Sequence, residues 1–158
     1  MATKKEKMEK IVKMLDKHDT TMLVTHDKQG GLVSRPMTVQ QTKFDGDVWM
    51  FVSNDADVID EIEADPEVNI AYSIKENYLS LSGNASIVDD DKKKKELWYP
   101  ELKHWFDGAG PESEKVKLIK ISVDTARYWD AAHGDSKKSK SGNGKKEESP
   151  IDSGMVKY

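Results

Sequence analysis

Arg35 is one of only two arginines in this 158-residue chain, the other being Arg127, and lysine supplies the remaining positive charge. A guanidinium presents a planar fork of N–H donors that suits a phosphate or a carboxylate. Arg35 stands in the run Gly31–Val39, which is rich in β-branched and apolar residues and predicts a strand. The next residue, Pro36, has no backbone N–H for a sheet, so this strand belongs on an edge, at a bulge or beside a ligand.

Other side chains do not form a recognisable catalytic motif. The chain has no cysteine, and its four histidines are scattered: His18, His26, His104 and His133. The sequence lacks a phosphate-binding glycine loop, a G-x-G-x-x-G pattern and a G-x-S-x-G pattern. A domain that binds a cofactor carrying its own chemistry is therefore easier to build from this chain than an enzyme with its own nucleophile or metal.

Composition narrows the class of protein. A formal net charge of −4 argues against a nucleic-acid binder that works by neutralising phosphates. No apolar run approaches the ~20 residues of a membrane helix, and the absence of cysteine fits the cytoplasm. With 36% hydrophobic and 34% charged residues, we expect one soluble domain with a lean core that invites a partner subunit or a cofactor.

Periodicity predicts the elements around Arg35. Apolar residues at helical spacing predict an amphipathic helix over 4–17. Strands are predicted at 20–26, 32–39 and 48–52, joined by tight turns into an antiparallel meander, and the third is apolar throughout, as if buried on both faces.

A short helix with Val58, Ile59 and Ile62 on one face should follow the third strand, with Asn54 or Asp55 as its cap. A strand that ends at a helix N-terminus offers free backbone N–H groups, so this junction is either an anion site or an ordinary helix cap.

The second half of the chain predicts further short strands, at 68–73, 78–88, 115–123 and 126–130. Gly83 inside a strand suggests a bulge, a barrel corner or a close backbone approach. Together the strands predict a small, closed or partly closed antiparallel barrel over residues 1–132, whereas 133–158 is polar enough to be a flexible tail.

Two features lie between these strands. The charge run 89–95 predicts a solvated helix face. Trp98 and Trp105, half of the four tryptophans, stand in the aromatic run that follows. Rings this close together predict either a core or a surface that something else covers.

Several runs, in one order, resemble the general stress protein 26 family, part of the pyridoxamine 5′-phosphate oxidase-like, FMN-binding split β-barrels. They are Ser34–Met37, Val48–Phe51, Asp65–Tyr72, Tyr78–Ala85, Glu96–Trp98, Trp105–Gly108 and Tyr128–Asp130. The resemblance covers roughly residues 5–132, with no large gap.

The resemblance implies a mainly β fold with flanking helices, a six-stranded antiparallel split β-barrel that forms a homodimer. It implies two FMN sites between the subunits, with FAD as the alternative cofactor. One subunit would supply the strand along the flavin ring and the strand end near the ribityl and phosphate groups, and the other subunit would cover the ring. The implied cofactor-binding residues are Arg35, Pro36, Met37, Val52, Ser53, Asn54, Trp98 and Trp105.

One position departs from the family pattern. Where the family usually has a phosphate-contacting lysine at the start of the short helix, this chain has Val58. Asp55 and Asp57 add negative charge nearby, which opposes phosphate binding. Either Arg35 and backbone N–H groups hold the phosphate, or flavin binds weakly, or the groove holds something else.

Three functions stay open. The chain could be a flavin-dependent oxidoreductase of the stress response, with NAD(P)H as a reductant and an unknown substrate. It could bind flavin without turnover, or it could be a structural dimer that has lost its cofactor, which Val58 favours. Few arginines and histidines argue against true pyridoxamine phosphate oxidation, which needs a second phosphate-bearing substrate.

Overall fold

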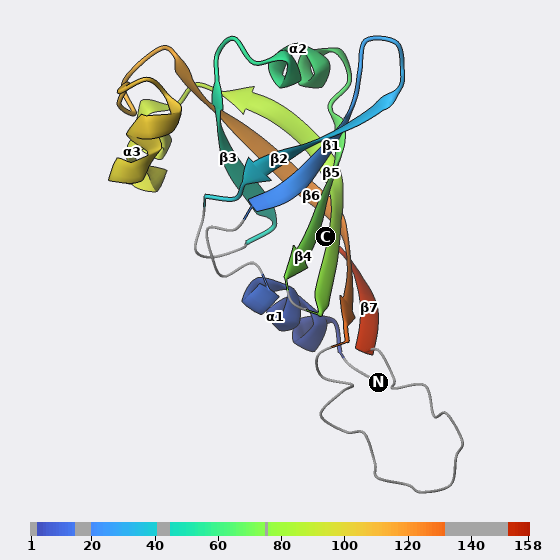
Figure 1. Ribbon diagram of the computed structural model, residues 1–158. Coiled ribbons are helices and arrows are strands. Elements are labelled where there is room, and N and C mark those ends of the chain that lie inside the picture. Colours follow the sequence, from blue (N-terminus) through green and yellow to red (C-terminus); the bar gives the residue numbers. More distant parts are fainter. Residues whose placement is uncertain (1–2, 15–19, 41–44, 75, 132–151) are drawn as a thin grey trace, which may run out of the picture.

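The computed structural model describes residues 3–14, 20–40, 45–74, 76–131 and 152–158, and Figure 1 shows its elements. The helices are α1 (Lys4–Met14), α2 (Asp57–Ala64), α3 (Asp91–Leu97) and the 3₁₀-helix η1 (Pro100–Trp105). The strands are β1 (Thr20–His26), β2 (Leu32–Thr38), β3 (Asp47–Ser53), β4 (Glu67–Ile74), β5 (Asn77–Val88), β6 (Val116–Asp130) and β7 (Asp152–Lys157). No described helix is both long enough and apolar enough to span a bilayer.

All strands join one antiparallel sheet in the order β2-β1-β4-β5-β6-β3, with β7 also paired to β6. The described sheet has seven strands and is open, so the prediction of six strands is wrong. The predicted meander is also wrong at its third strand, because β3 pairs with β6 and not with β2. Local alternation identifies strands, but it does not identify a partner that lies some 70 residues away in sequence.

Strands β2 and β3 therefore stand at the two ends of the sheet. Just beyond the end of β2, the Gln40 N–H donates to the Trp49 carbonyl of β3 at 2.9 Å. We call the region where these two strands approach each other the split. Helix α2 lies at one end of the sheet, above the split, and α1 lies at the other end (Figure 1).

Gly83 bends the long β5–β6 pair, as its place in a strand predicted. Ser82 pairs with Thr125 and Gly83 with Val123, which leaves Asp124 as the extra residue of a bulge. A Cβ at Gly83 would lie 2.0 Å from the Ser122 carbonyl oxygen, so only glycine permits this approach. The predicted strands 115–123 and 126–130 are consequently one bent strand, β6.

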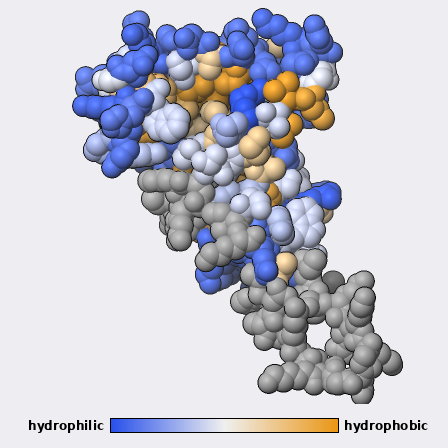
Figure 2. Space-filling view, viewed as in Figure 1, coloured by the Kyte–Doolittle hydropathy of each residue, from blue (hydrophilic) through white to orange (hydrophobic). Residues whose placement is uncertain are grey.

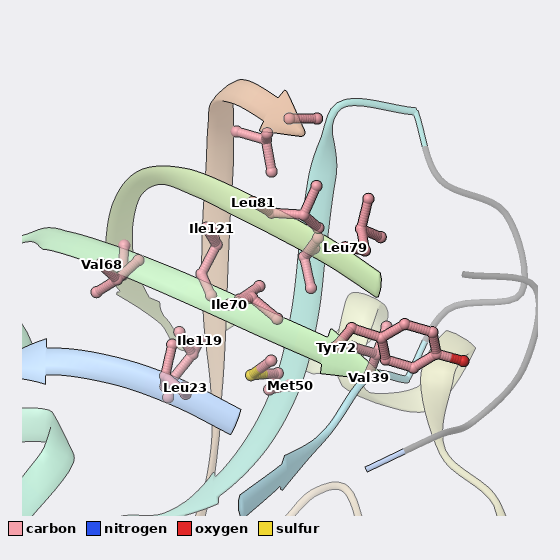
Figure 3. Packing of buried hydrophobic residues seen from close by; sticks show 14 of the residues in the cluster. Leu23, Val39, Met50, Val68, Ile70, Tyr72, Leu79, Leu81, Ile119 and Ile121 are labelled. Carbon is pink, nitrogen blue, oxygen red and sulfur yellow. The ribbon is translucent and has the colours of Figure 1, made fainter. Parts of the chain in front are cut away.

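The core lies on one face of the curved sheet, where side chains from several strands point toward one another (Figure 3). Ile11 of α1 and Val58 and Ile62 of α2 join this cluster. Phe51 of β3 belongs instead to a second cluster, formed with α3 and η1, which lie beside β3. Strand β3 is thus buried on both faces, as its apolar sequence predicted.

Part of the range assigned to the tail is a strand. Residues 152–157 form β7, and its Gly154 lies against Tyr128, where a Cβ would come within 2.6 Å of the phenol oxygen. Lys10 of α1 forms ion pairs with Asp130, at 2.8 Å, and with Asp152 of β7. The rest of the tail lies outside the described residues, so the division into domain and tail stays a prediction.

Candidate functional site

Register places Arg35 on the core face of β2, because it pairs with the buried Leu23 of β1. Its Nη2 donates to Glu61 Oε1 of α2 at 2.8 Å and to Thr25 Oγ1 at 3.0 Å. The side chains of Arg35 and Glu61 are only 20% and 10% exposed. Nη1 of Arg35 is buried and finds no hydrogen-bond partner in the described chain. Arg35 therefore lies under α2 with only some of its N–H donors hydrogen-bonded within the described chain.

The neighbours of Arg35 on β2 alternate. Met37 pairs with the buried Thr21 and packs against the main core, and the Thr21 hydroxyl donates to its carbonyl at 3.0 Å. Pro36 pairs with Met22 on the opposite, outer face, where Met22 is exposed. Within the described residues, β2 pairs only with β1 along this stretch, so its edge toward β3 is free. Pro36 thus sits on an edge strand, one of the three places that its missing N–H allows.

The end of β3 provides the opposite side of the split. Val52 is buried in the same cluster that Met37 packs against. Ser53 follows, and its hydroxyl donates to Asp55 Oδ1 at 2.6 Å, while the Asn54 N–H donates to the Lys115 carbonyl at 2.9 Å.

The predicted cap of α2 is wrong. The N-cap is Ala56, whose methyl side chain cannot accept a hydrogen bond, and Asp55 accepts from the Ser53 hydroxyl. Val58 is buried in the core, so its side chain does not reach solvent where a phosphate-contacting lysine would have to reach.

A groove of about 540 Å³ runs between α2 and the β1–β2 hairpin, and Arg35 and Glu61 lie in its wall. Its other lining residues are Asp27, Lys28, Gln29, Val33, Asp57 and Asp60. Four carboxylates face two cations here, so the groove, which we call the acidic groove, carries excess negative charge. By contrast, Figure 2 shows hydrophobic side chains gathered over β3 below α2, within a polar surround. One end of the site is apolar and the other is charged.

The two tryptophans of the predicted site lie in the α3–η1 region, on the other face of β3. Trp98 packs edge-on against Phe51, with ring centroids 5.4 Å apart, and lies 6.1 Å from the Phe106 ring. Trp105 is 80% exposed. The aromatic run is therefore partly buried against a core cluster at Trp98 and lies on the surface at Trp105.

The sequence matches a known protein family. The family model described as "Pyridoxamine 5′-phosphate oxidase like" matches residues 6–145. The chain belongs to this family. The resemblance that the ordered sequence runs indicated is thereby confirmed.

Solved structures of this pyridoxamine 5′-phosphate oxidase-like family share the fold. The general stress protein 26 of Bacillus anthracis is 29% identical, with a TM-score of 0.67, and the match covers 76% of this chain and 91% of that one. A general stress FMN/FAD binding protein of Xanthomonas citri is 26% identical, with a TM-score of 0.65, covering 79% of this chain and 89% of that one.

Protein bli-3 of Neurospora crassa, a curated relative, is 31% identical over an alignment of 134 positions, and the match covers 78% of this chain. The chain spans 64% of the length of bli-3.

The structure does not bring all the predicted site residues together. Met37 and Val52 share the main core, Arg35 lies on the same face of β2, and Ser53 and Asn54 follow at the end of β3. Pro36 lies on the opposite face of β2, and Trp98 and Trp105 lie apart. Sequence analysis missed Glu61. Its spacing held the signal, since a residue three positions after Val58 and one before Ile62 shares their buried helix face.

Proposed function

We propose that this chain binds a flavin in the split between β2 and β3 and acts as a cytoplasmic flavoprotein of the stress response. The observation that carries the proposal is the free edge of β2 beside an apolar surface. A flavin ring needs an apolar surface and a few placed N–H and C=O groups, and both are present here. The FMN/FAD binding relative from Xanthomonas citri supports the same class of cofactor.

The ring would lie along the β2 backbone at Arg35, Pro36 and Met37. The ribityl and phosphate groups would lie near Val52, Ser53 and Asn54, with the Arg35 guanidinium as the candidate cation for the phosphate. The residues fit the ring better than the phosphate, because Arg35 is paired with Glu61 and the acidic groove lies beside it. FMN is the proposed cofactor and FAD the alternative. A bound flavin would supply electron or hydride transfer, with NAD(P)H as the candidate reductant, and the chain would supply binding and orientation.

A homodimer is part of the proposal. The sheet face opposite the core exposes large hydrophobic side chains from four strands: Met22, Tyr78, Trp129 and Met155. Tyr78 pairs with Trp129 and Arg127 with Met155, so these side chains form neighbouring rows across the sheet. Large exposed apolar side chains on one sheet face suit association with a second copy. In such a dimer, Trp98 and Trp105 would cover the flavin of the partner.

A second candidate is a dimer without cofactor, or one that holds flavin without turnover. Buried Val58 and the carboxylates Asp55, Asp57 and Asp60 favour it, because they leave Arg35 as the only arginine beside the α2 end of the split. The visible absorbance of bound flavin distinguishes a flavoprotein from a cofactor-free dimer. NAD(P)H consumption distinguishes an oxidoreductase from a protein that binds flavin without turnover.

The test is an absorbance spectrum of the purified protein, before and after incubation with FMN and desalting. Retained flavin bands at one flavin per chain support the proposal, and consumption of NAD(P)H by the loaded protein supports turnover. A protein that stays colourless after reconstitution, but sediments as a dimer, supports the cofactor-free candidate. Sedimentation as a monomer contradicts the dimer.

A further inference from the structure

Glu61 is ion-paired with the guanidinium of Arg35, the group that an incoming phosphate would have to contact. Its Oε1 lies 2.8 Å from Arg35 Nη2, and that same nitrogen also donates to Thr25. Both partners of the ion pair are largely buried under α2. Low exposure strengthens the pairing relative to a surface ion pair, because water and salt screen it less. Removing Arg35 from Glu61 would therefore cost free energy that a ligand must supply.

The pair is nevertheless open to a ligand on one side. Both residues line the acidic groove, and the Arg35 side chain is 20% exposed, although its unpartnered Nη1 is itself buried in the described chain. A phosphate could reach the guanidinium only next to the Glu61 carboxylate. The phosphate of FMN carries a charge of about −1.5 to −2 near pH 7, so the carboxylate repels it. Riboflavin has the same ring and ribityl chain without the phosphate, and it escapes this repulsion.

From this geometry we infer that Glu61 sets the cofactor specificity of the site, by lowering the affinity for phosphate-bearing flavins relative to riboflavin. The inference rests on the proposed flavin function. In this role Glu61 acts in two ways: it is ion-paired with the Arg35 guanidinium, and its charge repels the phosphate. The departure at Val58 and the ion pair then work in the same direction, and they leave a site in which the ring and ribityl chain carry most of the binding.

The experiment measures the dissociation constants of FMN and riboflavin, by flavin fluorescence titration, for the wild-type protein and two variants. Glu61→Gln removes the charge and keeps the shape and an oxygen that can accept from Arg35. Asp60→Asn is the matched control, because it removes one negative charge from the same groove at an exposed position beside Glu61. Thermal unfolding of each variant checks that it is folded.

We expect Glu61→Gln to tighten FMN binding by about tenfold, as the loss of a like charge at close range would. Riboflavin binding should change by less than about twofold, because no phosphate meets the carboxylate. Asp60→Asn should change the FMN-to-riboflavin ratio by less than about threefold, since water screens an exposed charge.

Other results would overturn the inference. Equal effects of Glu61→Gln on both flavins would show that Glu61 does not act on the phosphate. If Glu61→Gln and Asp60→Asn changed the FMN-to-riboflavin ratio equally, the overall negative charge of the groove, and not the ion pair, would account for the effect. Binding of neither flavin, by the wild-type protein or by a folded variant, would overturn the proposed function itself and this inference with it.

Discussion

Lys94 and Arg35 both carry a positive charge into the protein, yet their surroundings differ. Lys94 is 1% exposed, and its ammonium lies 3.1 Å from Asp89, 3.2 Å from Asp91 and 3.1 Å from the Val116 carbonyl. Its three N–H donors therefore have at least three acceptors. Arg35 engages Glu61 and Thr25 through one nitrogen, and another of its nitrogens is buried without a partner among the described residues.

Lys94 is therefore a structural cation, whereas Arg35 keeps a hydrogen-bond donor that has no partner among the described residues. Lys94 fastens α3 to the start of β6, and nothing is left on its ammonium for a ligand. Arg35 lines a groove and retains an unused donor, which is costly unless something else satisfies it. Satisfaction of hydrogen bonds, more than burial, thus distinguishes the part of this molecule that holds the fold from the part that could hold a cofactor.

The largest effect is expected from Lys94→Ala, which should lower the free energy of unfolding by about 3 kcal/mol, because it leaves a cavity and removes the donors of the Val116 carbonyl and two carboxylates. Denaturant unfolding measures it. The control is the neighbour Lys95→Ala, an exposed side chain paired with Glu112, where a loss below about 0.5 kcal/mol is expected. Equal losses for the two lysines would contradict a structural role for Lys94.

Arg35→Ala should act on both stability and binding. Leaving Glu61 without its partner should cost about 2 kcal/mol of stability. FMN affinity should fall by about tenfold, as the loss of a charge-assisted contact would produce. Fluorescence titration measures the affinity, with Lys28→Ala as the control, because Lys28 is an exposed cation of the same groove. Unchanged FMN affinity in a folded Arg35→Ala protein would remove Arg35 from the site.

Sequence patterns predicted most helices and strands correctly, but they did not predict the partners of Lys94 and Arg35. Strand β1 has the predicted bounds, and Gly83 marked the bulge, because alternation and backbone crowding are local. The run 89–95 predicted a solvated face, and Lys94 contradicts this, because its partners at Val116 and Asp89 come from outside the helix. Glu61 was missed for a similar reason: its partner lies 26 residues away on another strand.

Strand β7 escaped prediction because its surroundings decide its structure. The sequence Asp152–Lys157 is short and polar, with a glycine at 154. It becomes a strand through β6, where Val156 is buried and Lys10 pairs with Asp152. In the proposed dimer, the surroundings of Trp98 and Trp105 would depend on a second subunit in the same way.

Low pH should weaken the ion pair between Lys94 and Asp89. Hydrogen bonds from Lys117 and Lys94 hold the pKa of Asp89 below its usual value. A carboxyl with a lower pKa in the folded state adds stability above its unfolded pKa and loses it as the pH falls through the folded pKa. Asp89→Asn should therefore be less stable than wild type near neutral pH, with the gap closing below the ordinary aspartate range. Parallel stability curves down to that range would contradict the coupling.

The smallest effect on stability is expected from Trp105→Ala, in the same α3–η1 region as Lys94. Because Trp105 is 80% exposed, its loss should change the free energy of unfolding by less than about 0.5 kcal/mol. Trp98→Ala is the contrast, since loss of its packing on Phe51 and Phe106 should cost about 3 kcal/mol. If Trp105 covers a flavin across the dimer, its removal should also reduce the quenching of flavin fluorescence in the loaded protein. Unchanged quenching would confine the α3–η1 region to a structural role, and Arg35 and its groove would then hold the site without it.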